Sequence, residues 1–481
     1  LALEYFHASL RLRQELGDSR AIANSFNNLG LVFRLRDDLS RAAECYKKSI
    51  DIFARIDDQY GMAAGMSNLA DVLEMEGRYN EALEYAFRSL EKRKRFNSKS
   101  GVAFSYYRIA KIYLSKGDLD KAMAFAEKSL ALRGEIGERM GTAYSQLQIA
   151  ELYLHSGRLF EAFQQCGRGE REFEKIQNDL GRMAAREILA RILIQMGVLD
   201  DAESLLEDTL DQARCGNQQI IVGACLLWLG RIALEKGRTG DAEAHLSRAE
   251  ALFRENTNRR EHAETLFERC VLALEEGEPG RASELLEEGY SILEALGIRD
   301  LVPRYFLLRG RIESEAPGGS PERARKFLER GLVEAREVHL PDLSWQLHFR
   351  LGLHLAGHGE PAVARGHLCE AQAILAAQYE PLPERFREGF WNTRERAKLR
   401  KLALEIAPGQ AAAKEGAPPG AEATPAPSDG QIQEIRALNR KLLSLHEVGQ
   451  AIISELDLDR LLEKLMDAVL ELVDAERGFL I

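Results

Sequence analysis

The sequence predicts an all-α fold, a solenoid of antiparallel helix pairs, because small residues recur along it at a fixed interval. The interval is 40 residues in each of three parallel series, and it lengthens once to 42. The first series is Gly30, Ala70, Ala110, Ala150, Ala190, Gly230, Cys270, Gly310 and Gly352. The second is Ala42, Ala82, Ala122, Ala162, Ala202, Ala242, Ala282, Ala324 and Ala364. The third is Ser49, Ser89, Ser129, Gly169, Thr209, Ala249, Gly289, Gly331 and Ala371.

A glycine stands between the first and second series in six repeats and marks the end of a helix. The six are Gly77, Gly117, Gly157, Gly197, Gly237 and Gly277. Glycine adopts the positive φ that ends a helix with little strain. Between these glycines apolar residues recur at helical spacing, as in IAKIYLSKGDLDKAMAFAEKSLALR, residues 109–133. Each repeat is therefore predicted as two closely approaching helices, and stacked repeats bury the apolar faces that one pair leaves open.

This repeat resembles the tetratricopeptide repeat in its long-helix form, and SFNNLGLVFRLRDDLSRAAECYKKSI, residues 25–50, is the most similar stretch. The resemblance covers residues 1–380 and implies a superhelix with a concave, protein-binding face. Ala2 lies 40 residues before Ala42. The chain is therefore expected to begin with the second helix of a repeat and to continue through about nine full repeats. The later repeats are less regular in sequence, with Cys270 in a small position and a Pro-Gly insertion near residue 318.

The composition of the chain disfavours nucleic-acid and membrane binding. The 481 residues carry a net charge of −11, and the basic stretch RERAKLRKLALE, 394–405, is interpreted as a solvated helix face. The longest apolar run, residues 220–230, is shorter than the roughly 20 residues of a membrane helix. Six scattered cysteines without a Cys-x-x-Cys motif indicate a reducing, cytoplasmic location.

The first helices of such repeats line the concave face, so the resemblance implies a partner-binding groove on the first four repeats. Its predicted residues are Asn24, Asn27, Asn28, Asn68, Asp71, Phe104, Tyr107, Arg108, Lys111, Tyr144 and Gln148. An asparagine amide both donates and accepts hydrogen bonds, which suits the backbone of an extended peptide. Arg108 and Lys111 would pair with acidic side chains, while Phe104 and Tyr107 would form an apolar wall.

A clamp for a C-terminal carboxylate, as in chaperone-type repeats, matches this sequence only at Asn68 and Arg108. Asn27, Leu31 and Phe104 replace the other lysines and asparagine of that clamp. We therefore expect the groove to bind a protein or peptide partner by another mode. The alternative is a polar inner face that is only solvated.

No catalytic, cofactor or metal site is predicted. The sequence contains no glycine-rich phosphate loop, and no Ser-His-Asp or Cys-His set stands out. His354 and His358 lie four residues apart on one helix face, as metal ligands would. They lack the glutamate of the HExxH arrangement and are interpreted as exposed or capping histidines.

Three segments are predicted after the repeats. Residues 381–406 form a capping helix, with Phe386, Phe390 and Trp391 covering the end of the stack. Residues 407–430, rich in Ala, Pro and Gly, form a disordered linker. Residues 431–456 form a coiled-coil helix that supports a homodimer, or alternatively one amphipathic helix that packs on its own domain. The predicted dimer seam consists of Ile435, Leu438, Leu442 and Leu445.

Residues 457–481 are predicted to open another domain. Apolar residues from Leu458 to Val473 form one helical stripe, and DAERGFLI, 474–481, predicts a turn and a buried strand. The segment resembles the beginning of a GAF sensor domain, an α/β fold, and reaches none of that domain's ligand-pocket strands.

Together these parts resemble the front of bacterial cytoplasmic signalling regulators, with the chain a fragment at both ends. That architecture implies repeats that bind a protein, a GAF domain that senses a small molecule, and a further output module. A sigma-54-dependent transcription-activating ATPase is the favoured output. The alternatives are a sensor histidine kinase or nucleotide cyclase, and a non-catalytic repeat scaffold.

Overall fold

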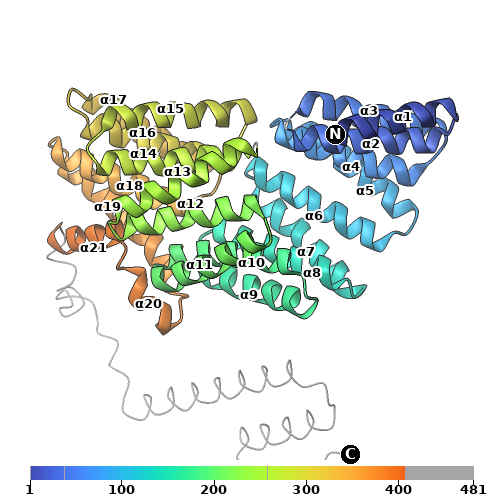
Figure 1. Cartoon of the computed structure of the whole chain (residues 1–481). Helices are drawn as coiled ribbons and strands as arrows, with labels where there is room; N and C mark the ends of the chain where they lie inside the picture. The colour runs from blue at the N-terminus through green and yellow to red at the C-terminus, as the bar shows by residue number, and fades with distance from the viewer. Residues whose placement is uncertain (1, 37, 257, 407–481) are drawn as a thin grey trace, which may run out of the picture. The chain divides into compact units, whose positions relative to one another are not determined.

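The computed structural model describes residues 2–36, 38–256 and 258–406, which form 21 α-helices and contain no strand (Figure 1). The first helices of the pairs are α2 (Ser19–Leu35), α4 (Gln59–Met75), α6 (Lys99–Lys116), α8 (Arg139–His155), α10 (Asp179–Met196), α12 (Gln219–Glu235), α14 (Arg259–Glu275), α16 (Val302–Glu315) and α18 (Pro341–Gly357). The second helices are α1 (Ala2–Glu15), α3 (Leu39–Arg55), α5 (Tyr79–Arg95), α7 (Leu119–Glu135), α9 (Leu159–Lys175), α11 (Leu199–Cys215), α13 (Thr239–Glu255), α15 (Pro279–Leu296), α17 (Pro321–Glu337) and α19 (Pro361–Tyr379). The last two helices are α20 (Glu384–Phe390) and α21 (Arg394–Ile406). The predicted solenoid of helix pairs is confirmed.

Residues in the turns set where helices begin and end. Asp18 and Asp38 each accept a hydrogen bond from the backbone N–H three residues later, and so satisfy a donor that the first helical turn leaves free. The six predicted turn glycines all have positive φ, between 72° and 87°. Their left-handed backbone ends the first helix of each pair and lets the chain reverse.

Small residues let the two helices of a pair approach closely. A Cβ atom on Gly30 would lie 2.8 Å from the ring of Tyr46, so only glycine fits against that ring. The Ser49 hydroxyl donates a 2.8 Å hydrogen bond to the carbonyl oxygen of Ala23 on the facing helix. The same bond recurs one repeat later at Ser89.

The later repeats keep the helix pair despite their irregular sequence. Cys270 is fully buried in α14 and packs as a small apolar residue. The two-residue insertion falls in the turn between α16 and α17, where Gly318 has a φ of 81°. The helix α16 starts only at Val302, because residues 298–301 form a turn instead.

Successive turns of the superhelix touch along a seam. We call the glycine turn inside a helix pair the intra-pair turn and the turn between pairs the inter-pair turn. A Cβ on Gly77, in an intra-pair turn, would lie 2.9 Å from the Cα of Gly297, in an inter-pair turn. The Tyr79 hydroxyl donates a 2.7 Å hydrogen bond to the Gly297 carbonyl. Gly117 meets Val338 in the same way one pair later.

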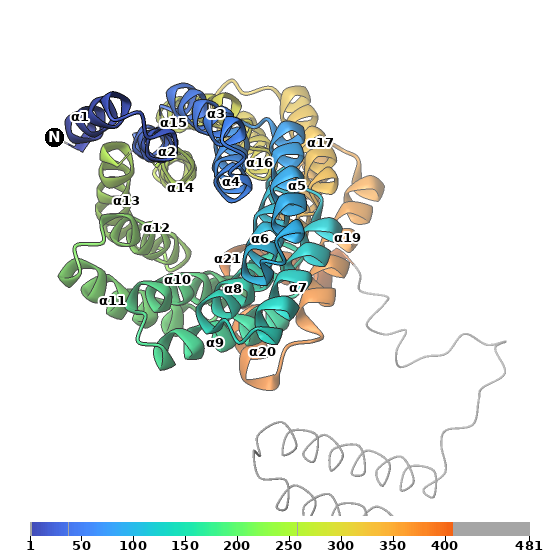
Figure 2. The same cartoon turned by 90° about the vertical axis from the view of Figure 1, so that its right-hand side faces the viewer.

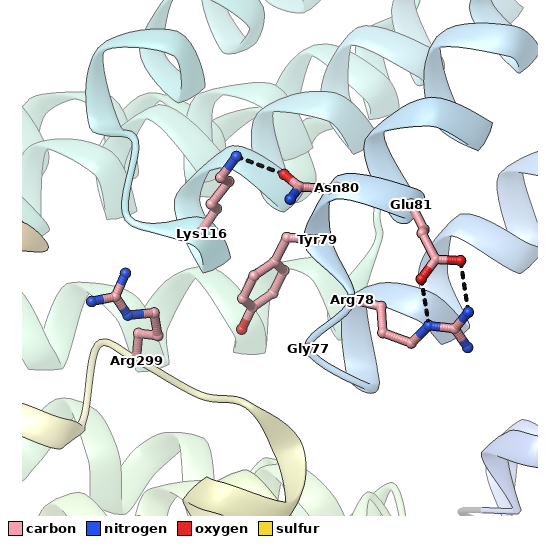
Figure 3. A pocket seen from close by; sticks show the side chains of 7 residues that line it. All are labelled: Gly77, Arg78, Tyr79, Asn80, Glu81, Lys116 and Arg299. Atoms are coloured by element: carbon pink, nitrogen blue, oxygen red, sulfur yellow. Dashed lines mark hydrogen bonds and ion pairs between the residues drawn. The ribbon is translucent and has the colours of Figure 1, made fainter.

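A crevice of about 290 Å³ opens beside this seam, and Tyr79 and Arg299 enter it from opposite sides (Figure 3). Lys116 donates a 2.8 Å hydrogen bond to Asn80 there. Arg78 is held by Glu81 on the same helix. Arg299 contacts Glu337 at 2.6 Å, outside the crevice, so each cation of the crevice already has a polar partner.

The helices α20 and α21 join the end of the array to pairs one superhelical turn earlier. The ring of Phe386 lies 5.1 Å from that of Phe163 on α9, and Phe390 is fully buried. Arg396 donates a 2.8 Å hydrogen bond to the carbonyl of Gln195, at the end of α10. The predicted linker 407–430, the dimer seam and the GAF segment 457–481 lie outside the described residues.

Candidate functional site

The inner wall of the superhelix consists of the first helices, and Figure 2 shows α4, α6, α8, α10 and α12 nearer its centre than the second helices. Neighbouring first helices pack directly on one another. A side chain on one first helix therefore reaches the same face of the next. The polar groups on this wall form a ladder with two recurring sequence spacings.

Bonds between residues 41 apart form the first kind of rung. Asn68 donates a 2.9 Å hydrogen bond from its side-chain nitrogen to the amide oxygen of Asn27. Gln148 donates a 2.9 Å hydrogen bond to the backbone carbonyl of Tyr107. Both bonds thus join residues one position beyond a full repeat of 40.

Ion pairs between residues 37 apart form the second kind of rung. Arg108 contacts Asp71, and the ammonium group of Lys111 lies 3.4 Å from the carboxylate of Glu74. Burial lowers the pKa of Arg108 to about 10, so its guanidinium remains charged at neutral pH and neutralises Asp71. Burial raises the pKa of Tyr107 to about 12 and keeps the phenol neutral.

The remaining predicted groove residues do not join the ladder. Asn24 and Asn28 are exposed, and neither forms a hydrogen bond within the described part of the chain. Phe104 is exposed, with the guanidinium of Arg93 5.1 Å from its ring centre. Tyr144 packs edge-on against Phe173, with ring centres 4.9 Å apart, and so belongs to the margin of the core.

The ladder continues on later first helices that the sequence analysis did not single out. The Trp228 indole N–H donates a 2.7 Å hydrogen bond to Glu187, again 41 residues away. Glu268 is fully buried and accepts hydrogen bonds from Arg231 at 2.8 Å and Arg304 at 2.6 Å. The spacings of 41 for Trp228 and Glu187, 37 for Arg231 and Glu268, and 36 for Arg304 and Glu268 were the signal that would have located these pairs.

Burial and pairing shift the acids of this later wall in opposite directions. Burial raises the pKa of Glu187 to about 7, and the charge of Arg191 only partly opposes it. Burial would also raise the pKa of Asp300, but the charge and hydrogen bond of Arg260, 2.6 Å away, hold it at about 2. The later wall therefore carries some carboxylates that are tightly paired with a cation and others whose negative charge is only partly offset.

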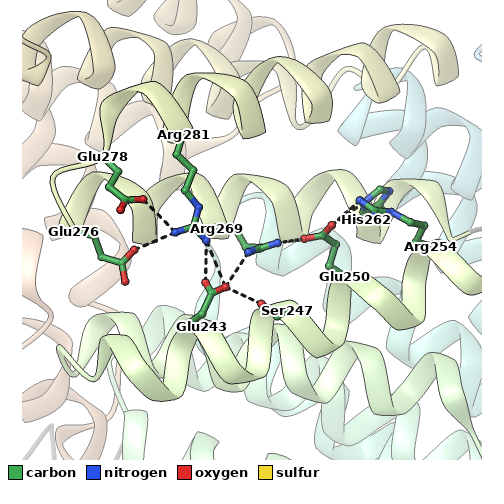
Figure 4. Close-up of polar contacts among 9 residues, drawn as sticks. All are labelled: Glu243, Ser247, Glu250, Arg254, His262, Arg269, Glu276, Glu278 and Arg281. Carbon is green, nitrogen blue, oxygen red and sulfur yellow. Dashed lines mark hydrogen bonds and ion pairs between the residues drawn. The ribbon is translucent and has the colours of Figure 1, made fainter.

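A separate polar cluster links α13, α14 and α15 (Figure 4). Arg269 binds Glu243 at 2.8 Å and also contacts Glu250, while Arg281 lies 3.4 Å from Glu243. His262, whose Nε2 lies 3.9 Å from the Glu250 carboxylate, and the guanidinium of Arg269 lower the pKa of Glu250 to about 2 although burial opposes the shift. This cluster holds three consecutive helices together.

Residues 2–36, 38–256 and 258–406 contain neither a membrane-spanning helix nor a metal-binding cluster. No helix of this part is long and apolar enough to cross a membrane. No group of three or more His, Cys, Asp or Glu side chains in it is arranged to hold a metal ion.

The tetratricopeptide repeat family model matches residues 1–55 and 61–135. A Rap protein solved in complex with Competence and Sporulation Factor is 14% identical, with a TM-score of 0.54 over 75% of this chain and 99% of that one. The Rap conjugation gene regulator of plasmid pLS20, solved with a Phr peptide, is 13% identical, with a TM-score of 0.50 over 74% and 96%. A search of curated proteins found no significant match. The described residues form a solenoid of the tetratricopeptide-repeat type.

Proposed function

We propose that the inner wall formed by α2, α4, α6 and α8 binds an extended segment of a protein or peptide partner. The observation that carries this proposal is the ladder of amide side chains on adjacent first helices, centred on the bond between Asn68 and Asn27. That bond uses one donor hydrogen of Asn68 and one acceptor of Asn27. The other amide groups of the two side chains are left for a ligand.

Gln148 adds a buried acceptor to the same wall. Its side chain is only 4% exposed, and its amide nitrogen is used by the carbonyl of Tyr107. Within the described residues its amide oxygen has no hydrogen-bond partner. A buried polar atom without a partner costs free energy, so a ligand N–H that reached this oxygen would bind favourably.

The charges on this wall favour recognition of a peptide backbone over recognition of acidic side chains. Arg108 and Lys111 already pair with Asp71 and Glu74. An incoming carboxylate would have to displace these partners, whereas an extended backbone offers one donor and one acceptor at each residue. The fold accommodates such a ligand, since the pLS20 Rap regulator, which shares it, was solved with a peptide.

The test begins with selection of peptides from a random library on the full chain, followed by fluorescence anisotropy with the selected peptides. Asn68→Ala and Gln148→Ala should each weaken binding about fivefold, because each removes a neutral hydrogen bond worth roughly 1 kcal/mol. Gln212→Ala, at an exposed position on the second helix α11, is the matched control and should have no effect. Equal binding by all three variants would contradict the proposal.

The proposal also covers the activity that partner binding would control. The resemblance of residues 457–481 to a GAF domain supports this part of the proposal. We infer a bacterial cytoplasmic regulator in which the repeats bind a protein and the GAF domain senses a small molecule. The favoured output is a sigma-54-dependent activator, with a histidine kinase, a nucleotide cyclase or a scaffold as alternatives. Sequencing the gene beyond the codon for Ile481 tests it. A Walker A loop followed by a helix-turn-helix is expected, and a nearby stop codon would contradict the proposal.

A further inference from the structure

Exposed apolar side chains gather on one edge of the solenoid, along the inter-pair turns. Of the 13 large apolar side chains that are exposed in the described residues, seven lie in or next to the inter-pair turns between α1 and α12. We call them the apolar edge: Leu16, Ile56, Tyr60, Phe96, Met140, Leu180 and Ile220. Scattered apolar residues are normal on a protein surface, but their recurrence in each of the six inter-pair turns from α1 to α12 marks an interaction surface.

The seam inside the chain shows what this kind of edge contacts. Leu296 and Val338 occupy the inter-pair turns of later repeats, at the positions that correspond to Leu16 and Ile56. They are only 8% and 3% exposed. The carbonyl oxygen of Leu296 and the side chain of Val338 each lie 3.1 Å from the place of a Cβ on Gly77 and on Gly117, in the intra-pair turns of earlier repeats. Ile56 and Phe96, at the corresponding positions of the apolar edge, are 38% and 37% exposed. An apolar inter-pair edge therefore packs against a glycine-turn edge wherever the chain supplies one.

Within residues 2–36, 38–256 and 258–406 there is also a matching glycine-turn edge whose glycines no residue of this part packs against. Gly77 and Gly117 lie so close to the seam that a Cβ on either would meet an atom within 3.1 Å. The same place in later pairs is occupied by Gly237, Gly277, Gly318 and Gly359. A Cβ on any of these four would meet no described atom within 4 Å. We call these four turns the glycine edge. One copy of the protein thus carries both halves of a seam, each unpaired.

We propose that the apolar edge of one copy docks on the glycine edge of a second copy, so that the superhelix continues from one molecule into the next. The partner is a second copy because the chain itself carries the surface that its apolar edge packs against within the seam. Two different surfaces meet, so the contact is head-to-tail and does not close on itself after two copies. This inference does not depend on the proposed peptide groove.

Sedimentation velocity of the full chain over a wide concentration range tests the proposal. All proteins carry Leu438→Asp and Leu442→Asp, so that the coiled coil predicted at 431–456 does not contribute. The weight-average mass should rise with concentration beyond that of a dimer. Met140→Glu and Leu180→Glu on the apolar edge should each weaken association at least tenfold, and Val333→Glu, at an exposed position on α17, should not.

The glycine edge is tested with Gly280→Glu, at a helical position next to Gly277 where an added Cβ meets nothing. It should weaken association as strongly as Met140→Glu, while Gly366→Glu, equally unobstructed on α19, should not. Circular dichroism should show the same helix content in every variant. A monomer at all concentrations would overturn the proposal. Loss of association in the apolar-edge variants alone would also overturn it, because it would indicate contact between two apolar edges.

Discussion

The inner walls of the early and late repeats occupy the same place in the fold but differ in chemistry. The early wall, on α2 to α8, carries amide bonds such as Asn68 to Asn27, with groups left unused. The late wall, on α10 to α16, carries buried charges such as Glu268 between Arg231 and Arg304. We propose that the same ladder geometry serves ligand binding in the early half, beside the ion pairs of Arg108 and Lys111, and cohesion between helices in the late half.

The largest effect is expected where the late wall loses a charge. Glu268→Gln leaves two buried guanidinium groups without their carboxylate, which should destabilise the protein by about 3–5 kcal/mol. Thermal unfolding followed by circular dichroism should show a Tm lowered by roughly 5 °C or more. Glu44→Gln, which breaks the exposed ion pair with Lys48, is the control and should leave the Tm unchanged. An unchanged Tm for Glu268→Gln would contradict the conclusion that the late wall holds neighbouring helices together.

The pH dependence of stability should show a second, slightly smaller effect. Because the folded pKa of Glu187 is about 7 and an unfolded glutamate titrates near 4.3, folding favours its protonated form. This contribution is complete below about pH 4 and is lost as the pH rises through 7, by at most about 4 kcal/mol. Tm values measured between pH 4 and 8 should therefore decline less in Glu187→Gln than in the wild type.

Glu250 should change the pH dependence of stability in the opposite direction to Glu187. Its folded pKa of about 2 lies below the unfolded value, so its contribution is complete above about pH 4 and is lost as the pH falls toward 2. Glu250→Gln should flatten only the acid limb of the curve. A wild-type curve that is flat between pH 4 and 8 would contradict the assignment for Glu187.

The smallest expected changes in Tm distinguish the functions of the two walls most clearly. Asn68→Ala should lower the Tm by only about 1–2 °C, since it removes one neutral hydrogen bond. It should nevertheless weaken a selected peptide about fivefold. Trp228→Phe removes the bond to Glu187 on the late wall and should lower the Tm similarly without changing peptide affinity. Reduced peptide affinity in Trp228→Phe would extend the binding site beyond α8.

The helix pairs were predictable because close approach of two helices requires small residues at fixed places. Gly30 beneath Tyr46 and the positive φ of Gly77 are local requirements, and each leaves a mark in the sequence. The rung from Asn68 to Asn27 was predicted only as two residues on one face. Its partners depend on the displacement between neighbouring helices, which no single repeat encodes.

The seam could not be predicted from the sequence. Contact between Gly77 and Gly297 depends on the small rotation between pairs, summed over more than five repeats. A slight change in that rotation would bring other turns together. The late wall was missed for another reason. Its pairs, such as Trp228 with Glu187 and Arg231 with Glu268, combine different residue types and are linked only by spacings of 41 and 37.

A crystal structure of the full chain with a library-selected peptide tests the central claim most directly. We predict an extended peptide along α4, α6 and α8, with its main chain within hydrogen-bond distance of the side chains of Asn68 and Gln148. A peptide bound along the late wall, on the outer helices or over the apolar edge would contradict the account.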